Sequence, residues 1–276
     1  MRTCKAVRPA STTPRFKDNP HRPLPHAHSM PLRPTALACA LALAPWLAQA
    51  ADAPAASESA AAAPVPPVVQ LRVDVPPYYI AARAPGEAPR VAVDPDVDAL
   101  LSSVNAADIL KARDAIAAQP DLVKPQTMIV LAMRLYDIGD RHDAVFWYYA
   151  GRDRFATMQR VLDMRSLQLI RSAEVVEAFE HAAGPAMDGF AYCSIAYQAE
   201  REDRALDWVA AHPYKILGFT ELPAQTEDRN AALAAAVNHL REAAQKKKAT
   251  FANPAALKEV ADARLAAHAH ERYCWR

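Results

Sequence analysis

The sequence is short of the patterns that mark common catalytic and nucleotide-binding sites. Its 276 residues include six glycines, and these form neither a phosphate-binding glycine loop nor a G-x-S-x-G turn. The histidines His142, His181, His212 and His239 have no H-E-x-x-H spacing. We therefore predict no catalytic, cofactor-binding or metal-binding residue from local motifs. A site assembled from residues far apart in the sequence stays open.

The chain has no large excess of charge of one sign after its first fifty residues. Seven of the 32 lysines and arginines, but one of the 31 acids, lie in the first fifty residues. The remainder therefore holds 25 bases and 30 acids, a net charge of −5. A protein with this mild negative balance has no basic footprint for phosphate backbones or anionic lipid heads. We expect neither as a partner.

Proline is sparse in the second part of the chain, since 17 of the 23 prolines precede residue 96. Proline fixes φ and removes a backbone donor, so the first part can hold little helix and little central strand. Residues 96–276 are rich in alanine and leucine, and five of the six glycines lie between their apolar-periodic segments. This pattern predicts a compact all-α domain of seven or eight helices.

One apolar run stands near the start. Residues 30–50 carry a base near their beginning, an apolar stretch over residues 36–48, and Ala48-Gln49-Ala50 as an A-x-A cleavage site. The stretch is shorter than the roughly 20 residues of a spanning helix. We predict a cleavable signal peptide, a periplasmic or secreted protein of a Gram-negative bacterium, and no transmembrane segment in the mature form. The alternatives are a buried core helix and a lipoprotein anchored through Cys39.

The segments around this run are predicted to be irregular or extended. Residues 1–29 lack apolar periodicity, so we expect them to be untranslated, with Met30 as the start, or disordered. Residues 51–67 are mainly alanine, proline and serine, which predicts a disordered linker. Residues 68–95 alternate in strand fashion at Leu71, Val73 and Val75. They predict either a small hairpin or an extended segment lying over the helical body.

Helices are predicted from the apolar spacing in residues 96–276. Asn105 is the expected N-cap of the first, and Pro120 ends it. The others are expected at about residues 126–138, 141–162, 166–182, 189–200, 204–211, 227–248 and 254–270.

The clearest pattern is a helical hairpin over residues 128–151, where small and large apolar residues recur on two helical faces joined at Gly139-Asp140. It resembles a tetratricopeptide or Sel1-like repeat spanning about residues 126–156. The positions that carry the resemblance, and that we expect to pack the hairpin, are Leu131, Ala132, Leu135, Gly139, Ala144 and Tyr148. The resemblance implies a protein-interaction role by analogy.

Loss of the first fifty residues leaves two of the four cysteines, Cys193 and Cys274. An even pair in an oxidising compartment favours a disulfide, with two separate packed thiols as the alternative. Closing a loop of about 80 residues would stabilise the fold by roughly 4 kcal/mol on the loop-entropy model. His268, His270 and Cys274 could also ligate a metal. The two histidines lie about 200° apart on a helix, however, which favours a solvated terminal helix.

Charged neighbours are interpreted as solvated helix faces, including Asp153-Arg154 and residues 200–204. Lys246-Lys247-Lys248 is expected to complement the negative end of a long helix. The aromatic residues 146–149 occupy every angular position around nearly one helical turn, so they cannot all face one two-helix contact. Trp147 or Tyr149 is therefore the expected partner-binding residue.

Together these features predict a module that binds a protein or peptide at the cell envelope and has no catalytic activity of its own. One alternative is an envelope enzyme whose residues converge only in three dimensions. Its sign would be a pocket that groups a histidine with acids or with Cys193. The other alternative is a structural spacer that residues 51–67 tether to the membrane through a lipid on Cys39.

Overall fold

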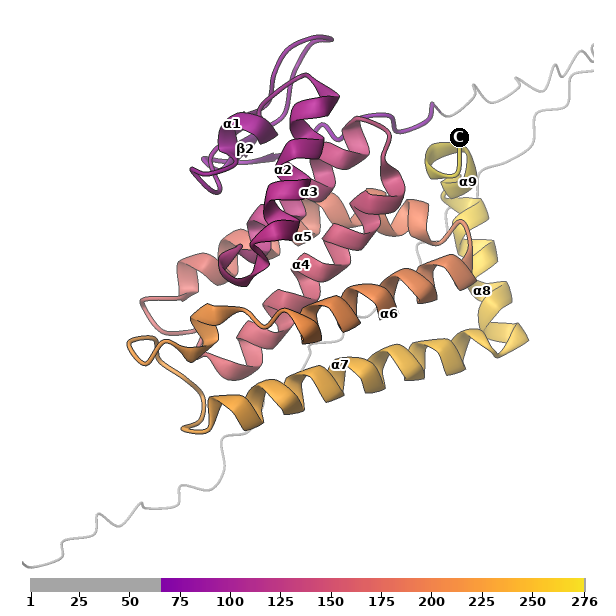
Figure 1. Cartoon of the computed structure of the whole chain (residues 1–276). Helices are drawn as coiled ribbons and strands as arrows, with labels where there is room; N and C mark the ends of the chain where they lie inside the picture. The colour runs from indigo at the N-terminus through magenta and orange to yellow at the C-terminus, as the bar shows by residue number, and fades with distance from the viewer. Residues whose placement is uncertain (1–65, 276) are drawn as a thin grey trace, which may run out of the picture. The chain divides into compact units, whose positions relative to one another are not determined.

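The computed structural model describes residues 66–275. The predicted signal peptide with Ala48 and Ala50, residues 1–29, the lipid alternative at Cys39 and nearly all of the linker lie outside these residues. Within residues 66–275 the chain is mainly helical, with a small sheet near their beginning (Figure 1).

The sheet is antiparallel, with strand order β1 (Asp74–Val75), β2 (Tyr79–Ile80) and β3 (Arg90–Val91). Val75 pairs with Tyr79, which pairs in turn with Val91, and all three side chains are buried. Just before β1, the Leu71 amide donates to Asp137 Oδ1 on helix α3 at 2.7 Å. The hairpin alternative is therefore confirmed, with a third strand added.

The helices follow in one series. They are α1 (Asp98–Leu101), α2 (Ala106–Ala118), α3 (Pro125–Asp137), α4 (Arg141–Val161), α5 (Ile170–Ala191), α6 (Ile195–Ala211), α7 (Arg229–Phe251), α8 (Pro254–Ala266) and α9 (Ala269–Tyr273), with short 3-10 helices η1 (Pro120–Leu122) and η2 (Lys215–Gly218). Asn105 caps α2 as predicted, since its side chain accepts from the Ala107 amide at 2.9 Å. Among the described helices, none combines the length and apolarity needed to cross a membrane.

The predicted hairpin is α3 and α4. Gly139 forms the turn with a φ of +88°, a conformation that glycine adopts without strain. At the open end of the hairpin, a Cβ on Gly151 would lie 3.0 Å from Ile129 Cγ1, so glycine allows the two helices to approach. Five of the six predicted packing residues are buried, namely Leu131, Ala132, Leu135, Ala144 and Tyr148, whereas Gly139 is exposed in the turn. The helical hairpin is confirmed.

Helix α4 lies at the centre of the helical body, because it packs against α3, α5, α6 and α7. Figure 1 shows α6 and α7 side by side, with α4 behind them. A helix with neighbours on this many sides buries both its apolar and its charged residues. This placement explains why several charged residues on α4 are buried.

Three predicted helix assignments are wrong. The segment expected at residues 254–270 is divided into α8 and α9 at His268, which has a φ of +49°. The segment expected at residues 166–182 continues as α5 to Ala191, through Pro185 and two glycines, and the segments at 189–200 and 204–211 are the single helix α6. A Cβ on Gly184 would lie 2.9 Å from the Tyr148 hydroxyl, and one on Gly189 would lie 2.6 Å from the Tyr273 ring. These glycines permit close packing of side chains against α5 and do not end it.

Candidate functional site

Charged side chains from four helices meet inside the helical body, where the sequence predicted solvated faces. Arg152 and Asp153 come from α4, Asp188 from α5, Glu202 from α6 and Lys247 from α7. Asp153 is 4% exposed and Glu202 is 7% exposed. The prediction of solvated faces at Asp153, Arg154 and Glu202 is therefore wrong, because α4 and α6 are covered by their neighbours.

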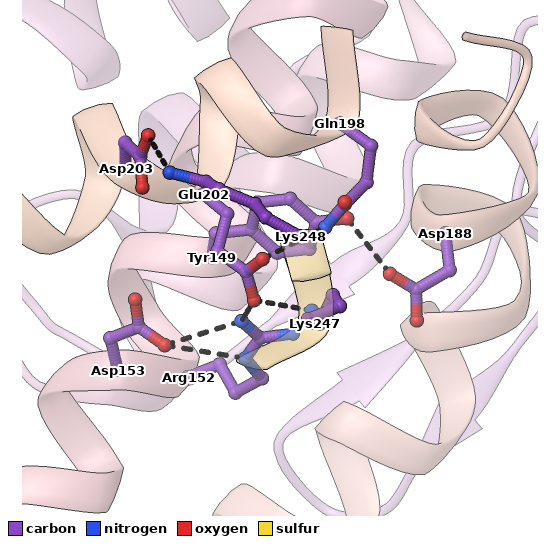
Figure 2. Close-up of polar contacts among 9 residues, drawn as sticks. All are labelled: Tyr149, Arg152, Asp153, Asp188, Gln198, Glu202, Asp203, Lys247 and Lys248. Carbon is purple, nitrogen blue, oxygen red and sulfur yellow. Dashed lines mark hydrogen bonds and ion pairs between the residues drawn. The ribbon is translucent and has the colours of Figure 1, made fainter. Parts of the chain in front are cut away.

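Glu202 is the centre of this charge cluster (Figure 2). Its Oε1 accepts from Arg152 Nη2 at 3.3 Å and from Lys247 Nζ at 2.5 Å. Its Oε2 accepts from Gln198 Nε2 at 3.1 Å. These contacts hold the pKa of Glu202 below its ordinary value in spite of burial, with the Lys247 hydrogen bond as the largest lowering contribution. The carboxylate is well paired and connects α4, α6 and α7.

Arg152 connects the cluster to the core aromatic residues. Its guanidinium lies 4.6 Å from the centre of the Tyr149 ring and also pairs with Asp153 at 3.3 Å. Burial raises the pKa of Asp153 to about 6, although Arg152 acts in the opposite direction. The cluster thus contains one carboxyl group that its surroundings push towards the neutral form.

Tyr149 points inward and donates its hydroxyl proton to Asp188 Oδ1 at 3.0 Å (Figure 2). Its side chain is fully buried, and Trp147 is 3% exposed, packed edge to face against Trp208 of α6. The prediction that Trp147 or Tyr149 lines a partner groove is therefore corrected. Helices α5, α6 and α7 cover the faces of α4 that α3 leaves open. The aromatic residues 146–149 can therefore all be buried, although a two-helix hairpin alone could not bury them.

The charge cluster has a structural role in this geometry. Its cations and carboxylates contact one another, and a cavity of about 270 Å³ beside it is lined by Arg152, Glu202 and Lys247 together with leucine and alanine side chains. Lys248 pairs with Asp203 at the edge of the same contact. Lys247 and Lys248 therefore attach α7 to α6. They also lie near the C-terminal end of α7, where the sequence predicted cations.

The second candidate site contains the disulfide. Cys193 follows the end of α5, Cys274 follows α9, and the two are bonded with Cα atoms 5.6 Å apart and a sequence separation of 81. The predicted disulfide is confirmed. It fastens the last helix to the end of α5.

An apolar groove of about 470 Å³ lies beside the disulfide. Its wall on α8 consists of Leu257, Val260, Ala261 and Leu265, and the opposite wall includes Tyr192 and Ile195. Leu257 is 37% exposed and Leu265 is 74% exposed. The spacing of these α8 residues at i, i+3, i+4 and i+8 places them on one helical face. That spacing is the signal by which the sequence could have indicated the groove.

Charged and polar side chains also line this groove. It is lined by Arg264, His270 and Glu271 as well as by both cysteines. Arg264 Nη2 lies 3.4 Å from Cys274 Sγ and donates to the Gly189 carbonyl at 3.2 Å. Burial lowers the pKa of this guanidinium. The groove thus groups a histidine and an acid with Cys193, the arrangement named above as the sign of the enzyme alternative.

The metal alternative loses its thiolate, because Cys274 is in the disulfide. Within residues 66–275, no three histidine, cysteine, aspartate or glutamate side chains lie close enough together to hold a metal ion. His142, His181, His239 and His268 are exposed, whereas His212 packs on Trp208 with ring centres 4.7 Å apart.

Comparison with known proteins identifies one informative relative. A Haemophilus influenzae protein described as uncharacterized is 31% identical over 209 residues, which cover 76% of this chain and 80% of the relative. No protein-family model matches the chain. No solved structure matches it either. The tetratricopeptide or Sel1-like resemblance of the hairpin therefore stays a prediction. The identity and coverage place this chain in the same protein family as the Haemophilus influenzae protein.

Proposed function

We propose that the protein is an exported helical module that binds an apolar segment of a protein or peptide at the cell envelope. The groove beside the disulfide is the proposed binding site. Its volume of about 470 Å³ falls within the range of roughly 300–1,000 Å³ that is usual for ligand sites.

The observation that carries this proposal is the apolar face of α8. Leu257, Val260 and Leu265 line the groove, although α8 has no buried residue of its own. An apolar helical face left half-covered in this way is a common recognition surface for apolar peptide side chains. Arg264 and His270 at the groove supply polar contacts that could fix the orientation of a bound peptide backbone.

Two features of the sequence support the proposal. The apolar run ending at Ala48 and Ala50 has the order of a signal peptide, which would take the protein to the periplasm. The hairpin of α3 and α4 resembles tetratricopeptide and Sel1-like repeats, and most such proteins bind other proteins. Because the hairpin aromatic residues are buried, we place this binding at the groove on α8.

Site-specific photocrosslinking in cells tests this proposal. A photoreactive amino acid replaces Val260 inside the groove, or Lys258 on the outer side of the same helix as the matched control. We expect a crosslinked peptide with an apolar sequence from position 260, little product from position 258, and loss of the product when Leu257→Asp is added. Equal crosslinking from both positions, or none from position 260, would contradict the proposal.

A further inference from the structure

We propose that the Cys193–Cys274 disulfide is a thiol-exchange site, in which a thiolate of a second molecule attacks Cys193 Sγ and Cys274 leaves as a thiolate beside Arg264. This inference deepens the proposed function, since it uses the same groove, but exchange with a small thiol does not require a bound peptide. The site therefore has a chemistry that the binding role alone would not need.

Access is the first requirement for exchange. Cys193 is exposed, and Cys274 is half-buried. Both line the apolar groove, which is open to solvent and wide enough to admit a thiol-bearing side chain. A disulfide whose task is solely structural is usually shielded from thiols, whereas an accessible one is open to exchange. Cys193 can therefore be approached from the groove.

Stabilisation of the leaving thiolate is the second requirement. Arg264 Nη2 lies 3.4 Å from Cys274 Sγ and 3.8 Å from Cys193 Sγ, so its guanidinium favours negative charge on Cys274 more than on Cys193. A thiol with a stabilised thiolate is the better leaving group in disulfide exchange. The arginine therefore selects the direction of attack, with Cys193 receiving the new bond.

Other ionisable groups face the disulfide from the elements around it. Tyr192 stands at the end of α5, and His270 and Glu271 stand on α9. The Glu271 carboxylate opposes the field of Arg264. Arg264 is the group among these that reaches the sulfur atoms, because its hydrogen bond to the Gly189 carbonyl holds it over them.

The exchange step is balanced in atoms and electrons. The incoming thiolate forms a disulfide bond with Cys193 Sγ while the Cys193–Cys274 bond breaks, and its electron pair goes to Cys274 Sγ. This step involves no net oxidation. Attack by a second thiolate on the sulfur that the first thiol contributed then releases those two thiols as a disulfide and leaves Cys193 as a thiolate. Two external thiols are oxidised, and the protein disulfide is reduced.

The last helix keeps other contacts when the disulfide opens. Tyr273 packs against Gly189, and the Val68 amide donates to the Arg272 carbonyl at 2.8 Å. The Arg141 guanidinium lies 3.8 Å from the centre of a Trp275 ring. These contacts keep α9 beside α5 in the reduced protein, so the reaction can be reversed on a folded chain.

The test measures reduction of the full chain in which Cys4→Ser and Cys39→Ser leave Cys193 and Cys274 as the cysteines. Native protein is mixed with glutathione, and the mixed disulfide is trapped by alkylation and located by mass spectrometry. We expect glutathione on Cys193, and reduction about tenfold slower in Arg264→Met because the leaving thiolate loses its cation. Arg264→Lys should restore most of the rate. Lys258→Met removes a charge from α8 without touching sulfur and should have no effect.

A second thiol identifies the source of the attacking group. A short peptide with cysteine between leucine and valine residues should react faster than glutathione if the groove binds apolar segments. Equal rates would identify small thiols as the reactants, which would remove support for the proposed peptide binding but leave the exchange site intact. Glutathione bound to Cys274, equal rates for wild type and Arg264→Met, or reduction only in denaturant would each overturn the exchange site.

Discussion

Arg154 is fully buried, and its guanidinium is held by backbone carbonyls. It donates to the carbonyl oxygens of Pro120 at 2.6 Å, Val123 at 2.9 Å and His212 at 2.9 Å. Burial lowers its pKa to about 10, so it stays charged at neutral pH. The planar fork of arginine suits this geometry, and it fastens the segment after α2 and the end of α6 to α4.

Glu180 on α5 is a half-buried residue whose carboxyl group has a different environment. Its Oε1 is buried and has no hydrogen-bond partner among the described residues, and burial raises its pKa to about 7. The folded protein therefore binds this proton more tightly than the unfolded chain does. The resulting stability is fully present below the unfolded pKa of 4.5 and is lost as the pH rises through about 7.

Glu180→Gln should accordingly stabilise the protein at pH 8, where it replaces a buried carboxylate by a neutral amide. We expect a gain of about 1–2 kcal/mol, less than the full pKa shift implies because water partly reaches the carboxyl group. The gain should shrink as the pH falls from 8 towards 4.5. Urea unfolding of the wild type and the variant at pH 5 and pH 8 measures this difference.

Glu174→Gln provides the matched control on the same helix, since its side chain is 60% exposed. It should change the free energy of unfolding by less than about 0.5 kcal/mol at either pH. If Glu180→Gln raised the free energy of unfolding equally at both pH values, the Glu180 carboxyl group would not be the titrating group.

Helix α7 is attached to the rest of the protein largely through charge. Of its 23 residues, Ala236, Val237 and Ala244 are buried. It forms ion pairs with α6 from Arg241, Lys247 and Lys248. Exposed pairs of this kind contribute little, but Lys247 reaches the buried carboxylate of Glu202. That contact should contribute most among the three.

Lys247→Met should therefore loosen α7. Glu202 would keep Arg152 and Gln198 but lose its shortest contact, and we expect a loss of about 1–2 kcal/mol in the free energy of unfolding. Relative to the wild type, amide hydrogen exchange should become faster in α7 and change little in α3. The exposed neighbour Lys246→Met, which removes the same charge, should leave both readouts close to wild type. Unchanged exchange in Lys247→Met would show that apolar contacts alone hold α7.

The helices that could be predicted from the sequence are those whose signals are local. The α3–α4 hairpin follows from apolar spacing and from Gly139, whose positive φ makes the turn. Helix α5 was divided wrongly because Gly184 and Gly189 resemble helix ends when their packing partners are unknown. Those partners, Tyr148 and Tyr273, come from α4 and α9.

The candidate site could be predicted only in part for the same reason. The disulfide was predicted by counting the cysteines that would remain after cleavage of the predicted signal peptide. The charge cluster could not be predicted, because Asp153 and Glu202 become buried only when α5, α6 and α7 surround α4. The sequence shows their charge but not the number of helices that cover them. Arg264 was missed because its relation to Cys274 depends on the path of α8 and α9.

The C-terminal part of the molecule is closed into a loop by the disulfide. The chain leaves Cys193, passes through α6, α7, α8 and α9, and returns to Cys274 after 81 residues. Among its neighbours α8 contacts chiefly α7 and α9. A crosslink across so long a loop removes conformations from the unfolded chain and so stabilises the whole fold.

We expect export and disulfide formation to be linked at the level of the whole protein. We expect a chain beginning at Met30 to be processed after Ala50 in a Gram-negative host and recovered with Cys193 and Cys274 bonded. A chain lacking residues 30–50 should stay in the reducing cytoplasm with both thiols alkylatable. Its free energy of unfolding should be lower by up to about 4 kcal/mol, on the loop-entropy model. Double replacement of both cysteines by serine in the exported chain is the control, and it should reproduce that loss.

N-terminal sequencing and thiol alkylation followed by mass spectrometry decide this prediction. An N-terminus at Ala51 with a bonded pair supports it. A lipid-modified N-terminus at Cys39 would instead support the structural spacer anchored at the membrane. The groove would then belong to a membrane-tethered protein. Two alkylatable thiols in the exported chain would contradict the link, because an oxidising compartment and cysteines 5.6 Å apart between their Cα atoms leave no barrier to the bond.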